Sequence, residues 1–414
     1  MGQDHGQELL AALRQLLHAS NIARADDLPA IVRAAGYEFG ATSAIVYVVD
    51  YDQVLLLPLL EADPQIEEKL LRSREPLPVE GTVAGRSFTD VTVVGSAGPL
   101  DSGLGFSVWA PVLDGTDRLG VLELVFEDEV ELDDGLATDV GLLAALVAEL
   151  VMSRTLIGDF VERARRRLPM LLEAELQWKL LPPLTFASPV VSIAGVLAPT
   201  NEVAGDSFDY AVNGDIAHLC IVDAMGHGLD ATLMSAVAIG ALRNARRSGL
   251  DLLDTTRSMN KHLASQFGGS KFVTAIVGEL DTNTGVWRWV NAGHPAALVV
   301  RGGRVVKALD SIINPPLGLQ PDAPVVGEER LERGDRLLLY TDGVIEARDA
   351  DGDFFGISRL VDLISREAAA GRPAAETMRR LNLAILAHQE GLLQDDATTL
   401  LVEWSHRDAV LMQP

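Results

Sequence analysis

Four acidic clusters in the second half of the chain place carboxylates beside small residues, where apolar strands are expected to end. They are Gly205-Asp206, Asp223-Ala224-Met225-Gly226-His227-Gly228, Tyr340-Thr341-Asp342-Gly343 and Asp395-Asp396-Ala397-Thr398. Any one of them also fits ordinary turn chemistry, because Asp favours turns. Hard divalent cations, however, prefer carboxylate and carbonyl ligands, and glycine lets backbone and water approach an ion. Four such clusters at one edge of a sheet favour a metal site, because grouped carboxylates repel one another unless a cation lies between them.

Alternating strand and helix patterns after Pro183 would hold these clusters in place. Strands are expected at 190–197, 216–222, 272–280, 286–291, 297–301, 336–340 and 398–404, and helices at 229–247, 252–265, 358–369 and 374–389. Tight turns such as Asn213-Gly214 and Thr284-Gly285 join consecutive strands, which favours an antiparallel sheet. With helices grouped between the strands, the predicted fold class is α+β.

The first part of the chain has the pattern of a small sheet with flanking helices. A helix is expected at 8–17, strands at 44–49 and 54–60, and a hairpin over 107–126 that turns at Asp114-Gly115. With Gly81-Thr82-Val83-Ala84-Gly85 and Trp109-Ala110-Pro111, this order resembles a GAF-type sensor domain over about Leu10–Leu150. The resemblance implies a ligand pocket beside the sheet, and so a small-molecule or protein signal.

These patterns divide the chain into a GAF-like domain (1–141), a helical linker (142–181), a second domain (182–405) and a tail (406–414). An apolar row recurs every seven residues through the linker: Leu143, Leu150, Ile157, Ala164, Leu171 and Trp178. This is the spacing of a coiled-coil seam, which predicts a parallel homodimer. Pro169 should kink or break the helix. The alternative is an amphipathic connector packed on its own domain.

Further motifs accompany the four clusters between about Leu180 and Trp404. They are Glu202-Val203-Ala204-Gly205-Asp206-Ser207-Phe208-Asp209, Phe272-Val273-Thr274, Asn291-Ala292-Gly293-His294-Pro295, Pro316-Leu317-Gly318, Gly334-Asp335, Val344-Ile345-Glu346-Ala347 and Phe355-Gly356. In order and spacing they resemble the metal-dependent protein phosphatases of the PPM, or type 2C, family, in the bacterial branch typified by stage II sporulation protein E. The resemblance implies an α-β-β-α sandwich that binds two Mn²⁺ or Mg²⁺ ions.

The resemblance also implies a ligand set. Its members are Asp206, Asp223, the Ala224 carbonyl, Asp342, Asp395 and Asp396. Asp223 would bridge the two ions, and Asp206 would complete the shell of one of them. Asp342 and Asp395 would hold the other, with Asp396 adjacent. The ions would lower the pKa of a water held between them, so that a hydroxide attacks phosphorus in line.

The implied substrate is a phosphorylated anti-sigma factor antagonist. Met225 stands where the eukaryotic members have a histidine acid, so the general acid is not identified. His227 and His294 sit in glycine-rich turns, where hydrogen bonding to a loop is favoured over catalysis. A pseudophosphatase that only binds a partner is the alternative class. The retention of every acidic position favours the enzyme.

Composition limits the partners and the location. Lys and Arg total 34 against 59 Asp and Glu, and the net charge of −25 argues against nucleic acid and anionic membranes as partners. The single cysteine, Cys220, cannot form an internal disulfide, and the start MGQDHGQELL lacks the pattern of a signal peptide. The apolar run Gly141–Met152 is shorter than a membrane span. We therefore expect a cytoplasmic protein without a transmembrane helix.

Overall fold

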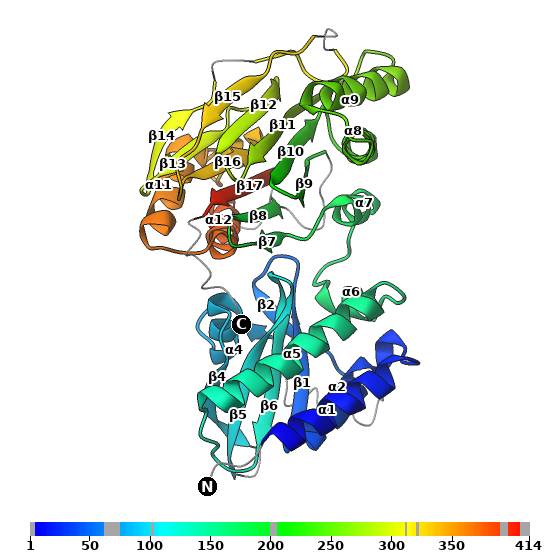
Figure 1. Cartoon of the computed structure of the whole chain (residues 1–414), viewed down its shortest axis with the longest axis vertical. Coiled ribbons are helices and arrows are strands. Elements are labelled where there is room, and N and C mark those ends of the chain that lie inside the picture. Colours follow the sequence, from blue (N-terminus) through cyan, green and yellow to red (C-terminus); the bar gives the residue numbers. More distant parts are fainter. Residues whose placement is uncertain are drawn as a thin grey trace. The chain divides into compact units, whose positions relative to one another are not determined.

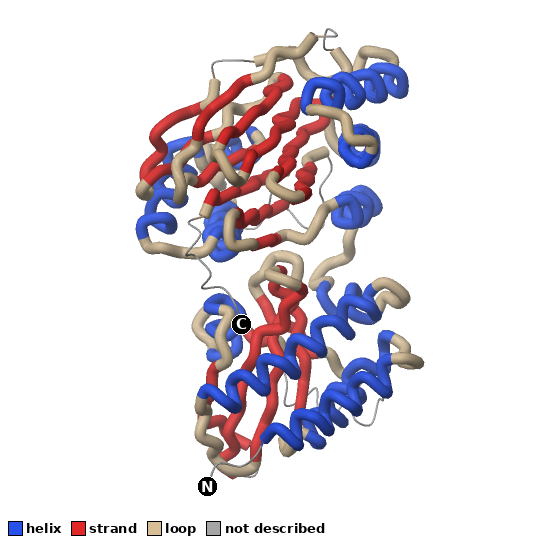
Figure 2. Tube along the Cα trace, in the orientation of Figure 1, coloured by secondary structure: helices blue, strands red, loops and turns tan. Residues whose placement is uncertain are grey.

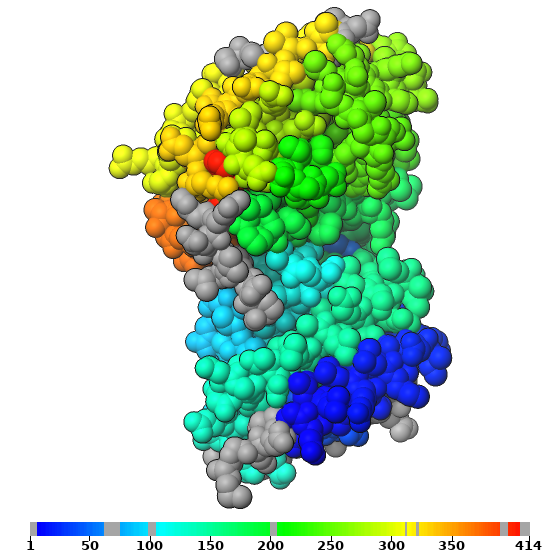
Figure 3. Space-filling view, viewed as in Figure 1, coloured from blue at the N-terminus to red at the C-terminus, as the bar shows by residue number. Residues whose placement is uncertain are grey.

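Contacts divide the chain into two units, residues 1–168 and 169–411. The computed structural model describes residues 5–61, 75–100, 103–198, 205–310, 313–319, 323–389 and 396–405. Figures 1 and 2 show that each unit has its own sheets and helices, and the space-filling view shows how side chains fill the gaps between the elements of a unit (Figure 3). The unit boundary falls inside the segment predicted as a linker.

The N-terminal unit is built on one antiparallel sheet with the strand order β3-β2-β1-β6-β5-β4. Its strands are β1 (Ser43–Val49), β2 (Leu55–Pro58), β3 (Leu77–Pro78), β4 (Val94–Leu100), β5 (Gly103–Asp114) and β6 (Asp117–Phe126). Its helices are α1 (His5–Ser20), the 3-10 turn η1 (Ala25–Asp27), α2 (Leu28–Glu38), α4 (Val83–Asp90), α5 (Asp134–Thr155) and α6 (Phe160–Arg165). The register of β5 on β6 confirms the hairpin predicted around Asp114-Gly115.

Alternation along the strands gives this sheet two buried faces. On β1, Val46 and Val48 pack with α1, α2 and α5 in the larger core. The neighbouring Tyr47 and Val49 point to the other face, where they pack with Phe88 of α4. Successive side chains of a strand point to opposite faces, so a single apolar strand serves both cores.

The predicted linker is not one long helix. Helix α5 ends at Thr155, Gly158 and Asp159 separate it from α6, and Pro169 lies in the break before α7 (Leu172–Leu180). Glycine and proline both disfavour the interior of a helix, which explains the two interruptions.

The first positions of the predicted coiled-coil seam face the core of their own unit. Leu143 and Leu150 are buried against the N-terminal sheet and its helices. Ile157, by contrast, lies beyond the helix end and is 67% exposed. The packing of α5 fits the alternative, a helix packed on its own domain. A heptad spacing alone does not distinguish this alternative from a coiled coil.

Helix α5 is also longer than the apolar run predicted from the sequence. By length and composition it could cross a membrane, the one helix in the described part of the chain of which this is true. In the structure it places Leu136, Val140 and Val147 in the N-terminal core. Apolar helices of this kind are common in globular cores.

The C-terminal unit contains two antiparallel sheets, ordered β15-β12-β11-β10-β9 and β14-β13-β16-β17-β8-β7. Its strands are β7 (Thr185–Ala187), β8 (Val191–Ala198), β9 (Ser207–Asn213), β10 (Ile216–Ala224), β11 (Val273–Asp281), β12 (Val286–Ala292), β13 (Leu298–Arg301), β14 (Arg304–Ala308), β15 (Gly327–Arg330), β16 (Arg336–Tyr340) and β17 (Ala397–Trp404). Besides α7, its helices are α8 (Leu229–Arg247), α9 (Leu252–Phe267), α10 (Asp342–Glu346), α11 (Gly356–Ala369) and α12 (Ala374–His388). The sequence did not predict β7, β9, β14 or β15, which are short or polar.

The two sheets pack face to face, and helices cover their outer faces (Figure 1). Leu219 and Ile221 of β10 point into the core between the sheets. Cys220 and Val222 point to the opposite face, where α8 and α9 cover them. On the other sheet, α11 and α12 form the matching outer layer. This arrangement confirms the α+β class and the α-β-β-α sandwich.

Candidate metal centre

The expected ligands lie where strands of both sheets begin or end. Asp206 immediately precedes β9 and Asp223 is near the end of β10, its neighbour in the first sheet. Asp342 follows β16 and Asp396 precedes β17, which are neighbours in the second sheet. Asp395 lies outside the described residues. Each sheet therefore contributes two acidic residues to a common edge. The first sheet contributes Asp206 and Asp223, and the second contributes Asp342 and Asp396.

Asp206 and Asp396 join the two sheets directly. The backbone N–H of Asp206 donates to Asp396 Oδ2 at 3.2 Å. The hydroxyl of Thr341 donates to Asp206 Oδ2 at 2.6 Å. Thr341 is itself fixed by β17, because its N–H donates to the Thr398 carbonyl at 3.0 Å and its Oγ1 accepts from the Thr398 N–H at 3.0 Å. Thr341 was not assigned a role from the sequence, although it directly precedes an expected ligand.

Asp223 is oriented by a second hydroxyl and a buried histidine. Thr274 Oγ1 lies 3.4 Å from Asp223 Oδ2 and 2.8 Å from His294 Nδ1. When Thr274 donates to the carboxylate, the imidazole Nδ1 is the donor to Thr274. Asn291 holds the loop of His294 from both sides, accepting from its N–H at 2.8 Å and donating to its carbonyl at 2.9 Å.

His294 is a neutral, internal residue. It is buried, and burial lowers the pKa of its imidazole to about 3. Its place in the structure agrees with the hydrogen-bonding role expected for it, and its link to Asp223 through Thr274 adds a positioning function. His227, in contrast, is exposed at the start of α8.

Two glycines allow the ligand segments to meet. A Cβ at Gly343 would lie 1.8 Å from the Asp396 carbonyl oxygen, so the turn after Asp342 can touch the Asp396 segment only without a side chain. Gly205 has φ +140°, and a Cβ there would lie 3.3 Å from the Ala224 carbonyl oxygen. The Ala224 carbonyl thus lies next to the Gly205-Asp206 segment, which fits its implied role as a ligand.

The electrostatics of the cluster are unfavourable without a cation. Burial raises the pKa of Asp206 well above its ordinary value, and the nearby charges of Asp223 and Asp396 raise it further. Hydrogen bonds from neighbouring threonines, Thr341 first among them, oppose this effect. A divalent ion would remove the repulsion, so this set of oxygen donors fits a hard cation.

The described residues do not form a ready-made cage. Among them, no three His, Cys, Asp or Glu side chains converge closely enough to hold one ion. Carboxylates that repel one another stay apart until a cation binds between them, and the expected ligand Asp395 lies outside the described part. The structure thus brings Asp206, Asp223 and Asp396 within electrostatic reach without closing them around one point.

Comparison with known proteins identifies the class of this unit. Residues 213–405 match the family described as stage II sporulation protein E (SpoIIE). This match confirms the resemblance carried by the sequence motifs. Residues 213–405 thus form a SpoIIE-type domain of the PP2C phosphatase class.

Individual relatives cover parts of the chain. Phosphoserine phosphatase RsbU of Bacillus subtilis (strain 168) is 22% identical over 214 residues, covering 51% of this chain and 63% of RsbU. Phosphoserine phosphatase RsbP of the same organism is 29% identical over 162 residues, covering 38% of this chain and 40% of RsbP. The solved RsbU and RsbW domains of Rv1364c from Mycobacterium tuberculosis have a TM-score of 0.46 and 28% identity, covering 54% of this chain and 62% of that one. The chain therefore spans less than two thirds of the length of each.

Proposed function

We propose that the chain is a metal-dependent protein phosphatase that hydrolyses phosphoserine or phosphothreonine. The observation that carries this proposal is the buried contact of Asp206 with Asp396 and Thr341, near the charge of Asp223. The SpoIIE-type domain over residues 213–405 contains all of these residues except Asp206, which lies just before it. Two relatives named phosphoserine phosphatases support the reaction class.

In this proposal each residue has a defined task. Asp206, Asp223 and the Ala224 carbonyl would hold one Mn²⁺ or Mg²⁺ ion, and Asp342 and Asp395 would complete a second site shared through Asp223. Bound ions supply an activated water and neutralise the phosphoryl oxygens.

The surrounding residues keep the carboxylates in place. Thr341 fixes the Asp206 carboxylate, and the chain from His294 through Thr274 orients Asp223. Because His294 stays neutral and buried, it acts as an orienting group and donates no proton to a leaving group. Met225 is exposed and carries no acidic proton, so it cannot protonate the leaving serine or threonine oxygen.

The substrate and the control of the enzyme form the finer part of the proposal. We propose a phosphorylated anti-sigma factor antagonist as the substrate, in the cytoplasm, on the strength of the relation to RsbU and RsbP. The N-terminal unit would act as a GAF-like sensor for a small-molecule or protein signal. Its antiparallel sheet, with α4 on one face and α1, α2 and α5 on the other, supports that assignment.

The test is a phosphatase assay on the full chain with p-nitrophenyl phosphate and then with phosphoserine proteins. We expect activity with Mn²⁺ or Mg²⁺, loss of activity with EDTA, and recovery when the metal is restored. Asp223→Asn should be inactive while still folded by circular dichroism, and the exposed Asp254→Asn, on α9, is the matched control. Full turnover in EDTA would contradict the proposal. A wild-type chain that binds phosphoprotein without hydrolysing it would instead indicate the binding-only alternative.

A further inference from the structure

Two helices reach the segment that carries Asp206 with buried polar side chains. Gln177 of α7 is 1% exposed, and its Nε2 donates a hydrogen bond to the Asp206 carbonyl. Ser235 of α8, also buried, donates its hydroxyl to the carbonyl of Gly205. Two consecutive carbonyls are thus held by side chains from two different helices.

With this contact, every polar group of Asp206 has a partner in the protein. Its N–H donates to Asp396, its carboxylate accepts from Thr341, and its carbonyl accepts from Gln177. The three partners come from three separate segments of the C-terminal unit. Together they fix both the backbone and the carboxylate of the residue.

Gln177 is an unusual choice for the buried face of this helix. Its Oε1 is buried and has no hydrogen-bond partner among the described residues. A buried amide oxygen without a partner is unfavourable, so an apolar residue would serve simple packing better. The bond from Nε2 to Asp206 is therefore the feature that distinguishes Gln177 from a packing residue.

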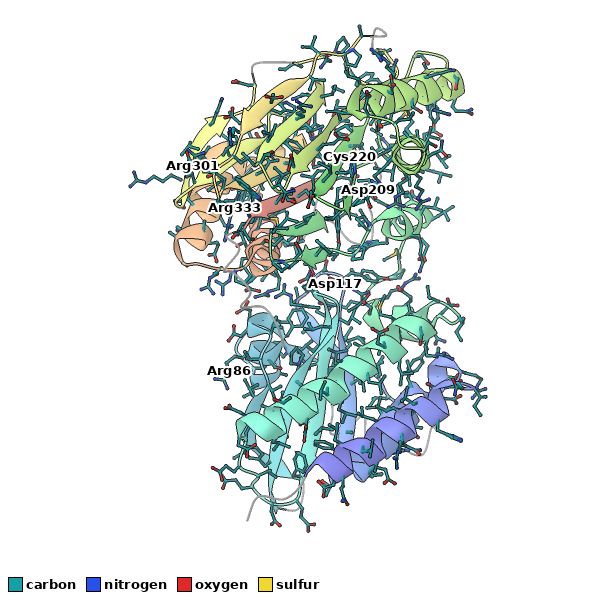
Figure 4. All side chains as sticks on the ribbon, in the orientation of Figure 1. Arg86, Asp117, Asp209, Cys220, Arg301 and Arg333 are labelled. Atoms are coloured by element: carbon teal, nitrogen blue, oxygen red, sulfur yellow. The ribbon has the colours of Figure 1, made fainter. Side chains whose placement is uncertain are left out.

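Helix α7 is anchored to α8 at its C-terminal end. At its end, the Leu180 carbonyl accepts from Arg243 Nη2 of α8 at 2.7 Å. Arg243 Nη2 and Arg246 Nη1 also bind the buried carboxylate of Asp209, at 2.6 and 2.8 Å. Asp209 is labelled in Figure 4. An arginine shared between a buried carboxylate and a helix end restricts the position of that helix.

We propose that Gln177 is a positioning residue for the metal centre, which sets the geometry of Asp206 from helix α7. This inference rests on the proposed function, in which Asp206 binds a divalent cation. Residues that orient metal ligands typically change metal affinity about 10- to 100-fold when they are replaced. Gln177 would act through Asp206 and would not touch the ion or the substrate.

The decisive variant is Gln177→Met, which keeps the length and volume of the side chain and removes the donor. The matched control is Leu176→Met, at the neighbouring exposed position of α7. For each full-length protein, Mn²⁺ affinity is measured by isothermal titration calorimetry, and thermal unfolding is followed without metal. We expect Mn²⁺ to bind about 10- to 100-fold more weakly to Gln177→Met than to the wild type. Its affinity for Leu176→Met should stay within about 2-fold of the wild type.

A second variant, Gln177→Asn, has an amide that is one methylene shorter and should also bind Mn²⁺ more weakly. It replaces the methionine variant if that protein does not fold.

The outcomes separate this inference from the proposed function. If wild type and Gln177→Met bind Mn²⁺ equally and hydrolyse phosphate esters alike, Gln177 has only a packing role and the inference is wrong, while the proposed function stands. A lower unfolding temperature with unchanged Mn²⁺ affinity would also show that Gln177 has only a packing role. If the wild type neither binds Mn²⁺ nor hydrolyses a phosphate ester, the proposed function fails and the inference fails with it.

Discussion

Asp206 and Asp342 are both expected metal ligands, yet they differ in burial. Asp206 is 3% exposed and has its N–H, carboxylate and carbonyl bound by other residues. Asp342 is exposed at the first residue of α10. Burial and neighbouring charges raise the pKa of Asp206, which shows that the fold fixes this carboxylate at an electrostatic cost. An exposed carboxylate keeps more of its contact with water than a buried one. One expected ligand is thus held inside the fold, and the other faces solvent.

The largest expected effect is on metal binding at the buried side. Asp206→Asn should lower both Mn²⁺ affinity and phosphatase activity about 100-fold or more, because a fixed anionic ligand becomes neutral. Asp342→Asn should lower activity as well. For both variants, Mn²⁺ affinity is measured by calorimetry and activity by the turnover of p-nitrophenyl phosphate. Equal, near-wild-type Mn²⁺ affinity in the two variants would remove the distinction between the two sides.

A smaller effect is expected from the hydroxyl that holds Asp206. Thr341→Val keeps the shape of the side chain and removes the 2.6 Å hydrogen bond to the Asp206 carboxylate. We expect Mn²⁺ affinity to fall about 10-fold or more, as for other residues that orient a metal ligand. Thr341→Ser retains the hydroxyl and should bind Mn²⁺ within a few-fold of the wild type. If serine and valine were equally damaging, the methyl packing and not the hydrogen bond would be responsible.

Asp206→Asn should have the opposite effect on stability: Mn²⁺ affinity falls, but the metal-free protein becomes more stable. Because the folded protein raises the pKa of Asp206, its ionised form destabilises the native state at neutral pH. Asp206→Asn should therefore increase the free energy of unfolding of the metal-free protein, because it removes a buried charge that burial and neighbouring carboxylates disfavour. Asp342→Asn, at an exposed position, should change it by less. Urea titrations in EDTA measure both, and a destabilised Asp206→Asn protein would contradict the electrostatic argument.

The last effect concerns acid stability at His294. Its folded pKa of about 3 lies below the ordinary 6.5, so the unfolded state binds a proton that the native state does not bind between these values. The contribution of neutral His294 is complete above about pH 6.5 and is lost as the pH falls towards 3. The stability difference between wild type and His294→Gln should therefore narrow between pH 7 and pH 4, by up to about 1.4 kcal/mol per pH unit. A difference that stays constant over this range would show that His294 is not protonated on unfolding.

Features set by neighbouring residues could be predicted from the sequence. The strand β10 and the helix α8 were predicted because a short apolar alternation and a longer helical pattern flank the glycines near Asp223. The grouping of Asp206, Asp223 and Asp396 followed from motif order, and the structure brings these three within electrostatic reach of one another. Asp342 and Asp395 stay predictions as ligands, Asp395 because it lies outside the described residues.

Features set by tertiary contacts could not be predicted. The spacing of Leu143 and Leu150 fits a coiled coil and a core helix equally well, and only the packing of α5 decides between them. Gln177 carries no motif, since its role depends on a contact with a residue 29 positions further along the chain. Thr341 had a weak signal, a hydroxyl directly before an expected ligand, but its partner Asp206 is 135 positions away.

Gly343 gives the centre a property that no other residue at this position could provide. The missing side chain lets the backbone after Asp342 rest on the Asp396 carbonyl, where a Cβ would lie 1.8 Å from the oxygen. Even alanine would force the two segments apart, because backbone atoms cannot rotate away as a flexible side chain can. In a saturation scan of this chain, position 343 should accept no substitution, whereas many replacements at the exposed position 342 should still give folded protein. The spacing between the two ligand segments is thus set by the absence of an atom.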